Sequence, residues 1–378
     1  MTAETRPLRV LFLTLYPETM PSSRLRVYQY LPELARLGFQ TKVLPAVPEP
    51  WFSRLYFSKL RALHAVYVLL EAALAFWRIA QAKNYDVVFV QKGIVSTNLR
   101  GFAAQLLRVS RRVIFDFDDD ILGRTMTEFR HPFLARLQDR REAEYVAAAS
   151  ACVIAGNEYL RGRVLPVNKS VVVIPTPVDT GRFCPAGRKA GEPASAAPLV
   201  IGWIGMEIGM SYLRSLAGVL QKLAAQQPVR LKVISRLQGG GKFSLPGVQT
   251  EFVPWSYEAE VREMQAFDIG IMPVRADEWG PGKCGLKLLQ YMALGLPAVA
   301  SQIGANSDIV DDGVDAFLAS TDEEWLERLL LLCRDANLRR RLGERARKKV
   351  EEVYSLKVMT VRLAEVLQGQ SQYAAKMI

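Results

Sequence analysis

The chain has 378 residues, 50% of them hydrophobic, and a formal net charge of +11 at pH 7. Its length exceeds that of one typical domain and predicts two, each with its own core. The lysines and arginines are scattered, without a zinc-finger, helix-turn-helix or RNP-type signature, so the positive charge does not indicate a nucleic-acid-binding protein. The four cysteines lie far apart and form no Cys-x-x-Cys pair, which argues against a disulfide framework and a zinc site.

The N-terminus passes directly into a strand-like segment. The sequence MTAETRPLRVLFLTL has no charged region followed by a long apolar run and a small-residue cleavage site, as a secretory signal would. We therefore expect a cytoplasmic protein in a reducing compartment.

Strand-like apolar runs alternate with helical segments along the first half of the chain. A strand is expected at 8–15, a helix at 24–38 and a strand at 39–44. More strands are expected at 85–91, at 112–117, around Cys152 and at 170–175. This alternation is typical of a mainly parallel, doubly wound α/β sheet with helices on both faces.

The pattern breaks at 179–198, which is rich in Gly, Pro, Ala and Ser and is predicted to be a linker. It then restarts with an expected strand at 199–205, a helix at 211–226, and further strands and helices. The predicted organisation is a first Rossmann-like domain over 1–178 and a second over 199–353. The segment 354–378 is expected to be a helix that packs back on the first domain.

An apolar insertion at 51–83 interrupts the first domain. It approaches the length of a membrane span, but Glu71 and Arg78 oppose spanning, because a charge at the bilayer centre costs about 2.5–3.5 kcal/mol. Two alternatives stay open: a helix lying on an anionic membrane face, or a helix or helical hairpin packed on the domain. The first is suggested by the mixed basic and aromatic residues Arg54, Lys59, Arg61, Trp51, Phe52, Tyr56 and Phe57.

Two lysines stand where a helix is expected to begin. The helical spacing starts at Leu286 and ends near Gly295, so Lys283 lies in the preceding loop and Lys287 in the first turn. Cations at the positive end of a helix cost a few tenths to one kcal/mol unless an anion compensates.

A bound phosphate or diphosphate would be such an anion. It could accept hydrogen bonds from the backbone of Cys284, Gly285 and Leu286 while the lysines neutralise its charge. The alternative is that Asp277 or Glu278 pairs with the lysines.

The segment 282–318, GKCGLKLLQYMALGLPAVASQIGANSDIVDDGVDAFL, resembles the donor-binding signature of the family 4 glycosyltransferases. Weaker similarity follows the family order at 13–39, 171–183, 199–205 and 354–367. The resemblance implies a GT-B fold, in which two Rossmann-like doubly wound domains face each other across a cleft. It also implies a retaining, metal-independent transfer from a nucleotide-sugar donor on the second domain to a glycan or lipid-linked acceptor on the first. Two alternatives stay open: a nucleotide-sugar epimerase of the same fold, and a catalytically degenerate protein that binds sugar nucleotides as a partner in an assembly. If the insertion lies on a membrane, the protein is expected to be peripheral at the inner face of the cell membrane; otherwise it is expected to be cytoplasmic without membrane contact.

Two features depart from the family pattern. The paired glutamates of the family correspond to Gly282 and Gln290, and the loop 205–213, GMEIGMSYL, lacks the usual phosphate-binding Arg and Lys. Our hypothesis is that Lys283, with Arg236, replaces them and stabilises the leaving diphosphate, so Lys283→Ala should severely weaken nucleotide binding. The donor-site residues expected from the resemblance are Gly205, Glu207, Arg236, Trp255, Lys283, Cys284, Gly285, Leu286, Lys287 and Gln290. Trp255 could line the base pocket or belong to a core or loop.

Four acids, Asp116, Asp118, Asp119 and Asp120, lie at the carboxyl end of the expected strand at 112–117. Acids this close repel one another and need a cation, basic partners or water. They could hold Mg²⁺ or Mn²⁺, cap a helix, or contact substrate. We favour Asp118 and Asp119 as catalytic-site ligands of the sugar or acceptor, and expect no bound metal.

The first expected helix opens with polar residues. Ser22 and Ser23 are capping candidates, and Ser23, Arg24 and Arg26 are expected to bind an anionic acceptor or donor phosphate, with solvated arginines as the alternative. The two histidines, His64 and His131, are expected to have surface or packing roles.

Overall fold

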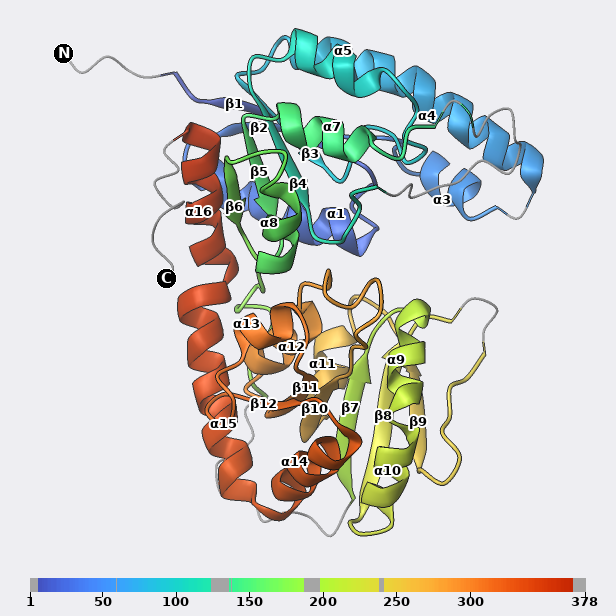
Figure 1. The fold of residues 1–378 in the computed structure, drawn as a ribbon, viewed down its shortest axis with the longest axis vertical. Coiled ribbons are helices and arrows are strands. Elements are labelled where there is room, and N and C mark those ends of the chain that lie inside the picture. Colours follow the sequence, from blue (N-terminus) through green and yellow to red (C-terminus); the bar gives the residue numbers. More distant parts are fainter. Residues whose placement is uncertain are drawn as a thin grey trace, which may run out of the picture. The chain divides into compact units, whose positions relative to one another are not determined.

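The computed structural model describes residues 6–58, 60–123, 136, 138–186, 198–237 and 241–369. The chain forms two compact units (Figure 1): unit 1 comprises Met1–Thr176 and Met359–Ile378, and unit 2 comprises Pro177–Val358. Each unit contains a six-stranded sheet, and the strands pair in parallel. The predicted pair of doubly wound α/β domains is confirmed.

The sheet of unit 1 has the order β2-β1-β3-β4-β5-β6. Its strands are β1 (Arg9–Thr14), β2 (Gln40–Pro45), β3 (Val87–Gln91), β4 (Val113–Phe117), β5 (Cys152–Ala155) and β6 (Val171–Val173). β3, β4 and β5 are buried along their whole length, as expected for strands covered on both faces. The order reverses between β1 and β3, which makes their carboxyl ends the switch point where doubly wound sheets bind ligands.

The helices of unit 1 are α1 (Pro21–Arg26), α2 (Leu31–Arg36), α3 (Trp51–Tyr56), α4 (Arg61–Ala82), α5 (Phe102–Val109), α7 (Glu142–Ala149) and α8 (Glu158–Val164), with η1 (Tyr28–Tyr30) as a 3₁₀ turn. The single helix expected over 24–38 is wrong. The chain leaves the helical conformation at Val27 (φ −132°, ψ −64°) and restarts as α2 with Pro32 in its first turn. Proline has no N–H to donate and is tolerated only in a first turn.

The last helix, α16 (Leu356–Gln368), belongs to unit 1 from Met359 onward. Arg112, just before β4, donates to the carbonyl oxygens of Val366 at 2.7 Å and Leu367 at 2.9 Å. The end of α16 is therefore fixed by a cation, the charge that a helix C-terminus favours.

The sheet of unit 2 has the order β12-β11-β10-β7-β8-β9. Its strands are β7 (Leu199–Ile204), β8 (Val229–Ser235), β9 (Thr250–Pro254), β10 (Ile269–Met272), β11 (Ala298–Ser301) and β12 (Phe317–Ala319). Its helices are α9 (Met210–Ser215), α10 (Ala217–Ala224), α11 (Glu260–Gln265), α12 (Leu286–Ala293), α13 (Ala305–Ile309), α14 (Asp322–Arg334) and α15 (Ala336–Lys349). The helix expected over 211–226 is therefore divided into α9 and α10. The strand order reverses between β7 and β10.

The expected linker over 179–198 is described only to residue 186. Phe183 is 3% exposed, and Arg347 of α15 donates to the carbonyl oxygens of Thr180 at 3.0 Å and Phe183 at 2.5 Å. The first part of this segment thus packs on unit 2. Residues 187–197 lie outside the described part of the chain.

The insertion at 51–83 forms the helix pair α3 and α4, and its Lys59 lies outside the described residues. By length and composition alone, residues 62–82 could cross a membrane. The side chains of Glu71 and Arg78 are nevertheless buried in unit 1, at 0% and 1% exposure.

Candidate functional site

The switch point of unit 2 lies at the carboxyl ends of β7 and β10. The loop after β7 begins at Gly205, and the loop after β10 leads into α12 through Gly285. This is where ligands bind in open α/β sheets. Most of the donor-site residues expected from the sequence follow strands β7, β8, β9 and β10 at this edge.

Lys287, in the first turn of α12, reaches back to the loop after β7. Its Nζ lies 4.6 Å from the ring centroid of Trp203, a fully buried residue of β7. A Cβ atom added to Gly205 would lie 2.6 Å from the same Nζ and 2.6 Å from the indole ring. Gly205 is therefore required by the close approach of lysine and tryptophan, in a cation–π arrangement.

The surroundings of Lys287 disfavour its charged form. Burial, together with the charge of Lys283, lowers its pKa to about 7. Within the described parts of the chain, no carboxylate pairs with Lys287. Since a partly buried charge without a carboxylate partner is unfavourable, an anion supplied from outside the protein would stabilise this lysine.

Asp277 was one of the expected internal partners of the lysines, but the structure gives it other contacts. One carboxylate oxygen accepts hydrogen bonds from the backbone N–H groups of Trp279 at 3.0 Å and Gly280 at 2.9 Å, and from the hydroxyl of Tyr212 at 3.0 Å. These bonds lower the pKa of Asp277 against the effect of burial. Asp277 therefore orders the loop after β10.

The N-terminus of α12 is open to an acceptor. Its N-cap is Gly285, with φ +66° and no capping side chain, so that residue leaves the first amides of the helix without a side-chain acceptor. A Cβ at Gly285 would lie 2.5 Å from Ile309 of α13. The glycine thus permits both the left-handed turn and the tight packing behind it.

The remaining expected donor residues occupy the same edge of the sheet. Arg236, after β8, lies over the ring of Trp255, after β9, at 5.3 Å, and the Trp255 indole N–H donates to Glu260 at 3.3 Å. Cys284 is 9% and Gln290 6% exposed. Lys283 is half-buried in the loop, Leu286 begins α12, and Glu207 is exposed in the turn after Gly205.

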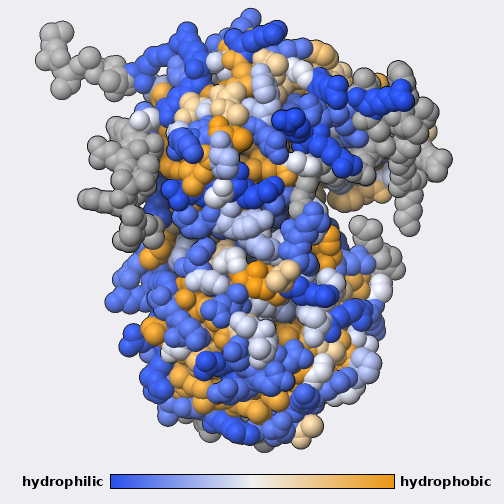
Figure 2. All heavy atoms as spheres, in the orientation of Figure 1, coloured by the Kyte–Doolittle hydropathy of each residue, from blue (hydrophilic) through white to orange (hydrophobic). Residues whose placement is uncertain are grey.

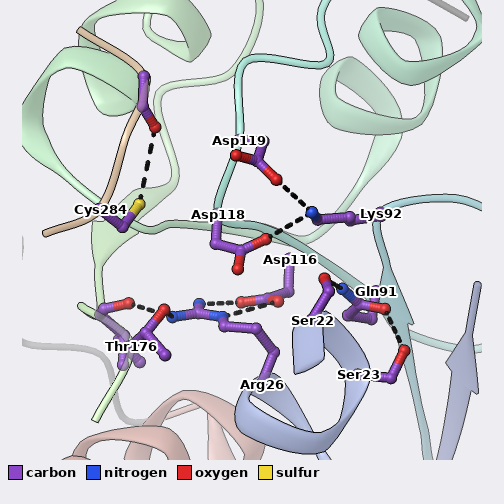
Figure 3. Close-up of polar contacts among 12 residues, drawn as sticks. Ser22, Ser23, Arg26, Gln91, Lys92, Asp116, Asp118, Asp119, Thr176 and Cys284 are labelled. Carbon is purple, nitrogen blue, oxygen red and sulfur yellow. Dashed lines mark hydrogen bonds and ion pairs between the residues drawn. The ribbon is translucent and has the colours of Figure 1, made fainter. Parts of the chain in front are cut away.

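In unit 1, the carboxyl ends of β3 and β4 hold a network of buried ion pairs (Figure 3). Arg26 of α1 makes a two-point ion pair with Asp116 of β4 and donates to the carbonyl oxygen of Ile174 at 2.7 Å. Both side chains are almost fully buried, at 2% and 1% exposure. Burial alone would lower the pKa of Arg26, but the Asp116 carboxylate outweighs it and raises that pKa. The expected substrate ligand Arg26 therefore joins α1 to the sheet.

Lys92, directly after β3, pairs with the two acids that the sequence favoured. Its Nζ lies 3.0 Å from Asp118 and also bonds Asp119. Burial acts to lower the pKa of Lys92, and the two carboxylates outweigh that effect and raise it. The fourth acid, Asp120, is 3% exposed and lies 3.6 Å from Arg163. The crowded acids are thus balanced by basic partners, one of the options open at the sequence level.

Ser22 and Ser23 were expected to cap the first helix, and this expectation is wrong. The N-cap is Met20, without a capping side chain, and Pro21 opens α1, so both serines lie inside the helix. Their hydroxyl groups instead bond the buried Gln91 at the end of β3, at 2.9 Å and 3.1 Å. Arg24, the third expected substrate ligand, is only partly buried.

The described residues contain no cluster of three or more His, Cys, Asp or Glu side chains that could hold a metal ion. His64 stacks on Tyr67 at 6.3 Å within the insertion. His131 lies outside the described residues.

Two site residues were missed at the sequence level, Trp203 and Lys92. Both lie at the carboxyl end of a strand that borders a switch point. The strand-end rule that singled out Asp118 would have found Lys92 as well, whereas the contact of Trp203 with Lys287 has no signal in the sequence.

Comparison with known protein families gives a match within unit 2. Residues 201–335 match the family model described as glycosyl transferases group 1. A search of the curated proteins found no match.

Solved structures match nearly the whole chain. A glycosyltransferase from Rickettsia africae superposes with a TM-score of 0.68 at 14% identity, over 97% of this chain and 100% of that one. Sucrose-phosphate synthase from Thermosynechococcus elongatus gives 0.68 at 13% identity, over 96% and 98%. Anabaena Alr3699/HepE, in complex with UDP and glucose, gives 0.65 at 14% identity, over 96% and 100%. The chain has the GT-B fold of these solved structures, and its residues 201–335 match the family model of the glycosyl transferases group 1.

Proposed function

We propose that this protein transfers a sugar from a nucleoside diphosphate sugar, bound by unit 2, to an acceptor bound by unit 1. The observation that carries the proposal is the position of Lys287. A lysine without a carboxylate partner in the described structure lies at the open N-terminus of α12, against Gly205 and at the switch point of the sheet. A diphosphate has the charge and the acceptor oxygens that such a site lacks.

In the proposed reaction, unit 2 stabilises the leaving nucleoside diphosphate. As the bond between sugar and diphosphate breaks, negative charge grows on the diphosphate oxygens. The ammonium of Lys287 and the first amides of α12 would hold that charge, and donors positioned in advance lower such a barrier most effectively. Lys283 adds a second positive charge in the loop before the helix, and Arg236 adds a third directly after β8.

The nucleotide is proposed to be a uridine diphosphate, since the Anabaena protein of the same fold was solved with UDP and glucose. Gln290 is proposed to bond the ribose, and Trp255 with Arg236 to line the base site. Arg236 lies over the Trp255 ring at 5.3 Å, so that a cation and an aromatic ring lie together at this position.

For unit 1 we propose that Asp118 and Asp119 accept hydrogen bonds from sugar or acceptor hydroxyl groups. Lys92 fixes both carboxylates from one side. A glycan or lipid-linked acceptor, retention of the anomeric configuration and a role in polysaccharide or glycolipid synthesis complete the proposal, as the resemblance to family 4 implies.

The test is a thermal-shift screen of UDP, GDP and ADP sugars, followed by product analysis. A ligand at 100 times its dissociation constant stabilises the folded protein by about 2.7 kcal/mol. We expect one nucleotide class to stabilise the wild type and to stabilise Lys287→Met less, and nucleotide release to accompany glycosylation or hydrolysis. A changed nucleotide sugar without any acceptor would identify an epimerase instead. The absence of stabilisation by every nucleotide sugar would refute the donor site.

A further inference from the structure

Helix α4 carries large apolar side chains on its outer face as well as on its inner face. Tyr67 and Ile79 are buried, at 0% and 4% exposure, and so are the charged residues Glu71 and Arg78, while Leu69, Phe76 and Trp77 are 70%, 56% and 51% exposed. A surface helix ordinarily has a polar outer face. The apolar outer face of α4 therefore calls for an apolar or amphipathic partner.

The buried charges fix the rotation of α4. Arg78 donates to the main-chain carbonyl oxygens of Thr14 at 3.1 Å, Leu44 at 3.1 Å and Ile94 at 2.7 Å, which lie at and just beyond the ends of β1, β2 and β3. Glu71 accepts hydrogen bonds from both the backbone N–H and the hydroxyl of Ser96, at 2.8 Å and 3.1 Å. Turning the apolar face inward would break all of these bonds, so the exposed face is a property of the folded unit.

The exposed large apolar residues from the N-cap Leu60 along α4, which we call the apolar stripe, are Leu60, Val66, Leu69, Phe76 and Trp77. At 1.5 Å per residue it extends over about 25 Å along the helix. Exposed apolar surface of this extent on a soluble protein marks a binding surface. Trp51 of α3, 52% exposed, adds a further aromatic side chain.

The neighbouring surface is basic. Between residues 51 and 112 the sequence contains ten lysines and arginines, of which Arg78 and Lys92 are buried, but only two acids, Glu71 and Asp86. Glu71 is buried, and Asp86 pairs with Arg6 at 2.6 Å. Arg54, Lys83 and Arg108 are exposed, so the surroundings of the stripe are cationic.

Helices α4 and α5 lie side by side, with the rings of Phe76 and Phe102 5.0 Å apart (Figure 1). Along this edge of unit 1, hydrophobic and strongly hydrophilic residues adjoin (Figure 2). An apolar strip bordered by cations matches the chemistry of an anionic bilayer, whose acyl region takes up the apolar side chains while its headgroups attract the cations.

We propose that the apolar stripe docks unit 1 on an anionic membrane surface, with α4 lying in the interface. We do not expect α4 to span the bilayer, because hydrogen bonds hold the side chains of Glu71 and Arg78 inside unit 1. A second copy of the chain is a poorer partner, because a symmetric interface would bring the same exposed cations together. The proposal rests on α4 alone and is independent of the sugar chemistry of unit 2.

The test is flotation of the full chain with vesicles of phosphatidylglycerol and phosphatidylcholine in equal amounts, and with vesicles of phosphatidylcholine alone. The variants are Leu69→Gln and Trp77→Gln, and the matched control is Leu37→Gln, an equally apolar residue of unit 1 that is 51% exposed away from the insertion. We expect binding to the anionic vesicles that weakens with salt. Each stripe variant should lower the partition coefficient about tenfold, as expected for the loss of one large apolar side chain, and the control should not.

Thermal unfolding of each variant checks the fold, and exposed positions should leave it unchanged. Equal partitioning of wild type and stripe variants would overturn the proposal, as would a lack of binding to anionic vesicles. A dimer seen by light scattering that both stripe variants dissociate would assign the stripe to a second copy and would also overturn it.

Discussion

Raising the pH above neutrality is expected to weaken the binding of UDP through a single group, Lys287. Its pKa in the ligand-free protein is about 7, because the partly buried side chain is shielded from water and Lys283 repels its charge. A diphosphate binds the protonated lysine, so the ligand must raise this pKa and draw a proton from solution whenever the lysine is neutral. A lysine with an ordinary pKa near 10.4 would give no such effect.

The magnitude follows from the charged fraction of Lys287. At a pH equal to its pKa half of the molecules are charged, and 1.5 units higher only about one in thirty is. Because the apparent dissociation constant is the intrinsic one divided by the competent fraction, the apparent dissociation constant for UDP should rise about fifteenfold between pH 7 and pH 8.5. The pH dependence is therefore large enough to measure by titration.

The assay is isothermal titration calorimetry with UDP at these two pH values, in two buffers that differ in ionisation enthalpy. Wild type should take up about half a proton at the lower pH and nearly one at the higher. Lys287→Met should bind more weakly by about 1.5–3 kcal/mol at pH 7, the loss of one charged hydrogen bond, and its affinity should lack the Lys287-linked pH dependence. In the matched variant Lys283→Met the charge that repels Lys287 is removed, so the pKa of Lys287 should rise and UDP affinity should fall only at higher pH.

Equal UDP affinity at both pH values without proton uptake would refute this reasoning. So would a Lys287→Met variant that keeps the wild-type pH dependence. A severe loss of affinity in Lys283→Ala with little loss in Lys287→Met would return the main role to Lys283, as the sequence suggested.

Three further predictions follow from individual contacts. The pKa of Lys287 is lower in the folded protein than in the unfolded chain, so the folded protein binds fewer protons and is destabilised at pH values below the unfolded pKa. Lys287→Met should therefore stabilise the ligand-free protein near pH 7 by about 1–3 kcal/mol after solvent screening. The melting temperature measured by calorimetry should rise, the gain should shrink towards pH 10, and a lower melting temperature would contradict the prediction. Gly205→Ala places a methyl group 2.6 Å from that lysine and should weaken UDP binding, whereas at Gly209 the nearest atoms are 3.4 Å away and alanine should be tolerated; equal affinities by titration would argue against the steric account. Arg26→Met leaves Asp116 buried and unpaired and should cost about 3–5 kcal/mol in denaturant unfolding, part of which the additional change Asp116→Leu should restore; an unaffected single variant would show that the pair is dispensable.

The strands and α12 were predictable because local signals agree there. The helix begins at Leu286, as expected, and both Gly285 and Gly295 have the positive φ that ends or starts a helix sharply, at +66° and +67°. Apolar runs of strand length identified the buried strands for the same reason. Where local signals conflict, as around Pro32, the expected helix was wrong.

The residues that each site residue contacts were not predictable, because these contacts depend on which segments the fold brings together. Lys283 and Lys287 look equivalent in the sequence, but only Lys287 lies on Trp203 and against Gly205. The insertion shows the same limit. Its composition suggested a membrane surface, yet only the structure shows that Glu71 faces the sheet and Leu69 the solvent.

The two units use basic residues at their strand ends in opposite ways. In unit 1, Arg26 pairs with Asp116, and Lys92 pairs with two carboxylates, so these cations are neutralised within the described structure. In unit 2, Lys287 has no such carboxylate among the described residues, and its pKa falls to about 7. A partly buried lysine without a carboxylate partner in the described structure, at the switch point of unit 2, favours an external anion there. This contrast argues for a phosphate-bearing ligand on unit 2 and a neutral, hydroxyl-bearing one on unit 1.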